Sequence, residues 1–186
     1  EPFKCPAGAK DSGYQPGNTV RWCEVTRDGR LLYHGPLLRW HRNDTLASRE
    51  FYDYGSGTGN WEAWHENGKP SSKGRMEKGA RIGLWKFWHE EGWLKTEIVY
   101  GPARYSWKEF FSDGKRHYAG DVIRGQKIGL WIEWNRDGSE RRRCDFGEGL
   151  FRVESASCKG IAESLTPKGF SRPVPKVTAS GPQLTL

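Results

Sequence analysis

Carboxylates and imidazoles are the side chains in this sequence whose chemistry suits catalysis or metal binding. Glu62, Glu109 and Glu133 each follow a tryptophan within two residues and are the candidates for an acid–base pair. The three do not share one position of the internal repeat described below. No nucleophile elbow, Walker lysine motif or HExxH motif is present. The sequence therefore predicts no catalytic residues and no enzyme.

Histidine recurs directly after tryptophan, at His41, His65 and His89. In a stack of hairpins, equivalent positions lie two strand spacings apart, which is about 9.6 Å. Metal-bound imidazole nitrogens must each lie about 2.1 Å from the ion. These histidines are too far apart for that, so we expect a solvated row of side chains, no metal site and no cofactor.

Four cysteines, Cys5, Cys23, Cys144 and Cys158, lie near the two ends of the chain. They form no CxxC pair and have no histidine at zinc-ligand spacing, which argues against a zinc site. Of the three possible pairings we favour Cys5–Cys23 and Cys144–Cys158, each closing a loop that stabilises the fold by about 3 kcal/mol. This pairing predicts an oxidising location, namely the periplasm, the exterior or an outer-membrane anchor. Four buried thiols in a cytosolic protein are the alternative.

The charges are well mixed along the chain. Thirty Lys and Arg residues against 23 Asp and Glu give a net charge of +7, and only Arg141–Arg143 form a basic cluster. A dedicated nucleic-acid site needs basic residues gathered on one face, so no nucleic-acid partner is expected. No run of 18 apolar residues occurs, and we therefore expect no transmembrane segment. The chain begins at Glu1, and we expect that a targeting segment preceded it.

The elements that must position these residues are revealed by an internal repeat. Trp61, Trp85, Trp107 and Trp131 are separated by 24, 22 and 24 residues. Three positions after each tryptophan comes a second aromatic residue: Trp64, Trp88, Phe110 and Trp134. Seven positions after it comes a glycine: Gly68, Gly92, Gly114 and Gly138. Six positions before it comes another glycine: Gly55, Gly79, Gly101 and Gly125. Such self-similarity indicates a repeat architecture.

Each repeat predicts one β-hairpin. Short aromatic-rich runs are followed by Asn-Gly or Asp-Gly pairs, as at Asn67-Gly68, which tolerate positive φ and are typical of hairpin turns. No segment of the repeats has an apolar period of 3.6, so helices are not expected there. Leu37 and Trp40 form a weaker copy of the pattern, and Trp22 with Gly29 is interpreted as an abbreviated first unit.

The string Gly79-Ala-Arg-Ile-Gly83-Leu-Trp85-Lys-Phe-Trp88-His-Glu-Glu-Gly92 resembles the MORN repeat, in the variant found in bacterial YwqK-type antitoxins. The resemblance covers about residues 20–153. It implies an all-β fold, an elongated, curved, single-layer antiparallel β-meander of tandem hairpins. It also implies association with proteins or membranes and no catalytic residues. We expect an irregular lead-in over residues 1–19, five to six repeat units over 20–153, and a cap with a proline-rich tail over 154–186.

Two aromatic ladders follow from the repeat, because residues three apart on a strand point to opposite faces. One is expected to be structural and consists of Trp61, Trp85, Trp107 and Trp131. The other is the candidate binding ladder and consists of Trp40, Trp64, Trp88, Phe110 and Trp134. Cross-strand packing alone accounts for both, and the alternative is that one forms a groove for an extended ligand.

The sequence favours a non-catalytic scaffold for protein–protein interaction in the bacterial cell envelope. Three alternatives remain open: a glycan- or peptidoglycan-binding module that uses the aromatic ladder, a protein that binds anionic lipid head groups, and an antitoxin-like protein.

Overall fold

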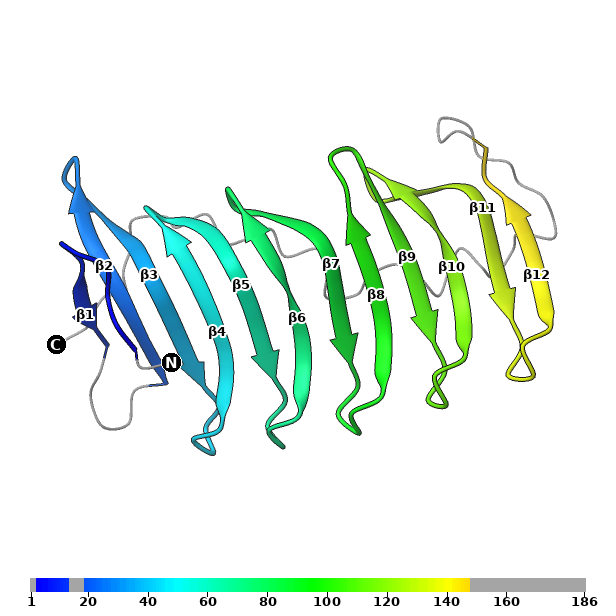
Figure 1. Ribbon diagram of the computed structural model, residues 1–186, viewed down its shortest axis with the longest axis horizontal. Coiled ribbons are helices and arrows are strands. Elements are labelled where there is room, and N and C mark those ends of the chain that lie inside the picture. Colours follow the sequence, from blue (N-terminus) through cyan, green and yellow to red (C-terminus); the bar gives the residue numbers. More distant parts are fainter. Residues whose placement is uncertain (1–2, 14–18, 148–186) are drawn as a thin grey trace, which may run out of the picture.

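The computed structural model describes residues 3–13 and 19–147, which form one open antiparallel sheet (Figure 1). Its twelve strands lie side by side in chain order, and no helix occurs in the described residues. The strands are β1 (Lys10–Ser12), β2 (Val20–Arg27), β3 (Arg30–Trp40), β4 (Leu46–Asp53), β5 (Ser56–Trp64), β6 (Pro70–Glu77), β7 (Ala80–Trp88), β8 (Leu94–Tyr100), β9 (Arg104–Phe110), β10 (Arg116–Ile123), β11 (Gln126–Trp134) and β12 (Glu140–Asp145). The predicted all-β meander of hairpins is confirmed.

The two long edges of the sheet carry different turns. At one edge, five-residue turns join β3–β4, β5–β6, β7–β8, β9–β10 and β11–β12, and each is closed as in the hydrogen bond from His65 N to Lys69 O. Gly68, Gly92, Gly114 and Gly138 have positive φ there. At the other edge, the β8–β9 connection spans residues 101–103. The β2–β3, β4–β5, β6–β7 and β10–β11 connections are two-residue turns in which both residues have positive φ, as at Lys78–Gly79, which marks type I′ turns. Glycine at these places is therefore set by backbone geometry.

The pairing of the strands has two kinds of irregularity. Beside every five-residue turn, one residue of the second strand is left unpaired; these residues are Ala47, Ser71, Lys95, His117 and Arg141. Towards the two-residue-turn edge, three residues of one strand face a single residue of its neighbour, as residues 83–85 face Gly74. This wider bulge recurs between β2–β3, β4–β5 and β10–β11.

The wider bulge explains why one repeat is two residues shorter than the others. Strands β8 and β9 pair without interruption from Thr96↔Glu109 to Tyr100↔Tyr105. Trp85 and Trp107 are therefore 22 residues apart, whereas the bulged repeats have 24. The bulge coincides with a positive-φ glycine two residues before the ladder position, as at Gly83 and Gly129. Tyr105 takes that place in the regular repeat, and a side chain there disfavours the positive φ that the bulge uses.

The hydrophobic core lies on one side of the sheet, which we call the core face. It is built from buried Met76, Trp85, Phe87, Ile98, Trp107, Val122, Trp131 and Cys144, with Trp61 packed against them. The Trp85 indole lies over Gly74, and its Nε1 donates a hydrogen bond of 3.0 Å to the carbonyl oxygen of Arg75. Trp131 repeats this arrangement over Gly120, donating to the carbonyl oxygen of Asp121. A ring that would otherwise be too bulky can thus sit flat against the strands.

The N-terminal segment differs in two ways from the expectation. The lead-in was predicted to be irregular, yet residues 10–12 form β1 on the outer edge of β2. The Cys5–Cys23 disulfide and the ion pair between Asp11 and Arg21 hold this segment in place. Trp22 was expected to begin an abbreviated repeat, and this is wrong: the turn after β2 belongs to the two-residue-turn edge, whereas Gly68 and its equivalents lie at the other.

The C-terminal end is described only to residue 147. Cys144 is buried on the core face, and no described cysteine is free. Its predicted partner Cys158 lies outside the described residues, as do the predicted cap and tail over 154–186, so these remain predictions.

Candidate interaction surface

The side of the sheet opposite the core, which we call the open face, presents a continuous row of directly paired residues. Because side chains alternate along a strand, the neighbours of the core tryptophans point to this side. The row runs without a break from β2 to β12 through Arg21, Leu38, Arg49, Glu62, Lys73, Lys86, Glu97, Lys108, Ala119, Ile132 and Arg143. We call it the central row. None of its members is buried.

Charges in the central row are paired across neighbouring strands. Lys73 Nζ lies 2.9 Å from Glu62 Oε1, and Lys86 Nζ lies 3.3 Å from Glu97 Oε1. Arg49 also reaches Glu62, at 3.8 Å. Ion pairs this exposed to solvent contribute little to stability. Their main consequence is a fixed pattern of positive and negative charges on an accessible surface.

Large apolar side chains are exposed beside the central row. Leu84 and Val99 face each other across β7 and β8 and are 48% and 45% exposed, and Leu130 on β11 is 43% exposed. Five large apolar side chains of the described residues are exposed to this degree, and three of them lie on the open face. A concentration of exposed apolar groups among charged ones is typical of an interaction surface.

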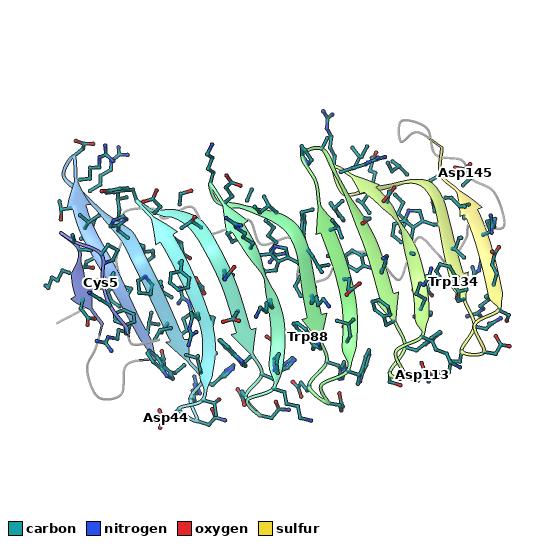
Figure 2. All side chains as sticks on the ribbon, viewed as in Figure 1. Cys5, Asp44, Trp88, Asp113, Trp134 and Asp145 are labelled. Carbon is teal, nitrogen blue, oxygen red and sulfur yellow. A yellow bond between two sulfur atoms is a disulfide. The ribbon has the colours of Figure 1, made fainter. Side chains whose placement is uncertain are left out.

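The two aromatic ladders occupy different environments. Trp85, Trp107 and Trp131 are buried on the core face, and Trp61 is partly buried beside them. The candidate binding ladder, Trp40, Trp64, Trp88, Phe110 and Trp134, is half-buried and lies next to the five-residue turns (Figure 2). Alternation along the strands places it on the open face. The Arg116 guanidinium covers the Trp134 ring, 5.4 Å from its centre.

Two of the recurring histidines, His41 and His65, each contact the backbone of the next hairpin, whereas His89 contacts Glu91 in its own turn. His41 Nε2 lies 2.9 Å from the carbonyl oxygen of Trp64, and His65 Nε2 lies 3.0 Å from that of Trp88. Asn43 donates in the same way to the carbonyl of Glu66 in the following turn. In residues 3–13 and 19–147, no three His, Cys, Asp or Glu side chains are grouped as metal ligands. These contacts therefore link each of these turns to the following one. The 24-residue spacing of the histidines and asparagines in the sequence could have indicated this role.

Comparison with protein families identifies the repeat. Residues 58–78 and 81–100 match the family model of the MORN repeat variant. No curated protein matches the chain. The two MORN matches run from β5 into the turn after β6 and over β7 and β8. The same turns and bulges recur in β3–β4 and β11–β12, outside the matched segments.

The three glutamates do not form one site within the sheet. Glu62 belongs to the open face, whereas Glu109 and Glu133 lie on the core face on either side of Tyr118. Glu133 is 1% exposed, with Arg141 Nη1 at 2.8 Å and Arg142 Nη2 at 3.1 Å from its carboxylate oxygens. Buried charge is tolerated because both oxygens have a cationic partner.

Glu109 and His117 are perturbed in the same neighbourhood. Burial raises the pKa of the Glu109 carboxyl, opposed by the charge of Lys95 and by the hydrogen bond from Trp107. Burial lowers the pKa of His117, whose Nδ1 lies 3.5 Å from Glu109 Oε1. Glu109 and His117 both interact with neighbouring side chains of the sheet, and these interactions favour a structural role.

No helix of the described residues is long and apolar enough to cross a membrane.

Proposed function

We propose that this protein is a non-catalytic scaffold that binds protein through the open face of its MORN sheet, in the bacterial cell envelope. MORN repeats form repeat scaffolds that often bind proteins or membranes. The observation that carries the proposal is the exposed apolar set Leu84, Val99 and Leu130 beside the charged central row. Apolar anchors within a polar frame favour a protein partner.

The glycan alternative receives less support from the geometry. A sugar-binding platform needs exposed aromatic faces, and the candidate ladder is half-buried beside the turns. The anionic-lipid alternative needs a surface of one charge, and Glu62 and Glu97 interrupt the cations of the central row.

The envelope location is supported by the Cys5–Cys23 disulfide, because such bonds persist in oxidising compartments. The non-catalytic role is supported by the partners of the buried acids, since Glu133 is held by two arginines.

Site-specific photo-cross-linking in the living host tests the proposal. A photoreactive phenylalanine at Leu84 is expected to form a covalent adduct with a protein. The same residue at Leu31, which is exposed on a different hairpin, is the matched control and should form little adduct. Adducts with glycan or lipid alone at Leu84 would favour the alternatives and contradict a protein-binding face.

A further inference from the structure

The open face is approximately palindromic about β7. For each strand on one side of β7, there is a strand at the same distance on the other side. We compare the residues that these two strands present on the open face. Strand β3 then corresponds to β11, and β5 to β9, while β6 corresponds to β8. Such correspondence matters because a twofold interface brings each residue of a pair against the other.

The outer pair of strands is apolar on both sides. Strand β3 presents Pro36, Leu38 and Trp40, and β11 presents Leu130, Ile132 and Trp134. All six are outside the buried core, being half-buried or exposed. Apolar residues therefore meet apolar residues at three levels of the sheet.

The inner pairs are complementary in charge and polarity. Strand β5 presents Asn60, Glu62 and Trp64, and β9 presents Ser106, Lys108 and Phe110. At matching levels these are two polar residues, an acid with a base, and two aromatic rings. On β6 and β8 the central-row residues are Lys73 and Glu97, again a base with an acid.

We propose that the partner of the open face is a second copy of this chain, packed face to face about a twofold axis along β7. This inference rests on the proposed function, since it names the protein that the open face binds. Face-to-face sheets lie about 10 Å apart, close enough for side chains of both to interlock. From β3 to β11 the contact would extend for about 38 Å at the usual strand spacing.

The residues on the axis are compatible with this packing. Leu84, Lys86 and Trp88 each meet their own copy there. Two lysines would repel each other, but each Lys86 ammonium has the Glu97 carboxylate of its own chain at 3.3 Å. At the two ends, Arg21 is paired with Asp11 and Arg143 with Glu140, so like charges there are also neutralised.

Cysteine cross-linking in the full chain tests the position of the axis. Leu84→Cys places a thiol on the axis, and a short bis-maleimide should link it to its copy in high yield. Leu130→Cys is the matched control: equally exposed, it would lie about 38 Å from its own copy and should give less than a tenth of that yield. Leu130→Cys mixed with Pro36→Cys should restore a linked dimer.

Charge reversal tests the complementarity. Glu62→Lys and Lys108→Glu should each raise the dimer dissociation constant at least tenfold in sedimentation velocity. An equimolar mixture of the two variants should dimerise like the wild type, because lysine then meets glutamate at both symmetry-related contacts. Lys78→Glu, in a tight turn away from the face, is the matched control. Circular dichroism establishes that each variant is folded.

The outcomes separate this inference from the proposed function. A wild-type chain that stays monomeric while its Leu84 photo-adduct contains a different protein overturns self-association and leaves the protein-binding face intact. Equal self-linking of Leu84→Cys and Leu130→Cys also overturns the twofold arrangement. Without any protein adduct at Leu84, both proposals fall.

Discussion

At the scale of single residues, the glycines beneath the core indoles carry a packing requirement. A Cβ at Gly74 would lie 2.1 Å from Cδ2 of Trp85, and one at Gly120 would lie 2.2 Å from Cδ2 of Trp131. Carbon atoms cannot approach this closely, so any side chain forces the indole or the strand to move.

Gly74→Ala is therefore expected to lower the free energy of unfolding by about 1–3 kcal/mol, the usual cost of overpacking. Urea unfolding followed by tryptophan fluorescence measures it. Gly57→Ala is the matched control, since a Cβ there would come no closer than 3.0 Å to the Trp61 ring and should cost less. Equal losses for the two variants would contradict the role assigned to Gly74.

The half-buried Lys127 makes the stability of the fold depend on pH, and the direction of this dependence follows from its shifted pKa. Burial lowers its pKa to about 8, and its Nζ lies 4.9 Å from the Trp131 ring centre. The unfolded chain has a lysine pKa of about 10.4, so between these values it binds more protons than the folded chain. The contribution of Lys127 to stability should therefore rise from pH 8 to pH 10.5 and be least favourable below pH 8.

Lys127→Met should be more stable than the wild type at pH 7, and this advantage should shrink by pH 10.5. Urea unfolding at pH 7, 9 and 10.5 measures the difference, with Lys78→Met in an exposed turn as the control. A pH-independent difference between the wild type and Lys127→Met would rule out the shifted titration.

At the scale of elements, hairpins were predictable and bulges were not. Each Asn-Gly or Asp-Gly pair carries its own backbone preference, so the five-residue turns follow from local chemistry. A bulge depends on which residue of the neighbouring strand it faces, as Gly83 faces Gly74, and this pairing is not local. The missing glycine at Tyr105 and the 22-residue interval were nevertheless signals of the one unbulged repeat.

The candidate site was predictable to a similar extent. Alternation placed the two ladders on opposite faces, but the central row emerges only when the register of eleven strands is known. Glu62 and Lys108 are 46 positions apart in the sequence, and nothing local relates them.

The Cys5–Cys23 disulfide fixes the smallest element. Strand β1 has three residues and, among the described strands, pairs only with β2, so its own hydrogen bonds hold it weakly. The disulfide spans 18 residues, for which the chain-entropy model gives about 3 kcal/mol. Cys5→Ser should lower the unfolding free energy by about this amount and release the amides of β1 to fast hydrogen exchange. Unchanged protection of β1 would show that its contacts suffice without the bond.

At the scale of the whole molecule, stability is expected to be local. Within residues 3–13 and 19–147, extensive contacts join only consecutive strands, so a defect in one strand can weaken its neighbours without directly affecting distant strands. Trp85→Ala should accelerate amide exchange most in β6–β9 and least in β2 and β12. Uniform acceleration along the chain, measured by mass spectrometry, would indicate a single cooperative unit instead.

The order of the strands also decides how the sheet responds to tension. Its first and last described strands lie at opposite ends (Figure 1), so a load between them acts along the interstrand hydrogen bonds and opens them one after another. Each freed repeat of 22 or 24 residues adds about 75–80 Å of extended chain, at some 3.4 Å per residue. Single-molecule stretching should give a series of low, evenly spaced steps. A protein anchored at both ends would thus yield gradually, as an extensible tether.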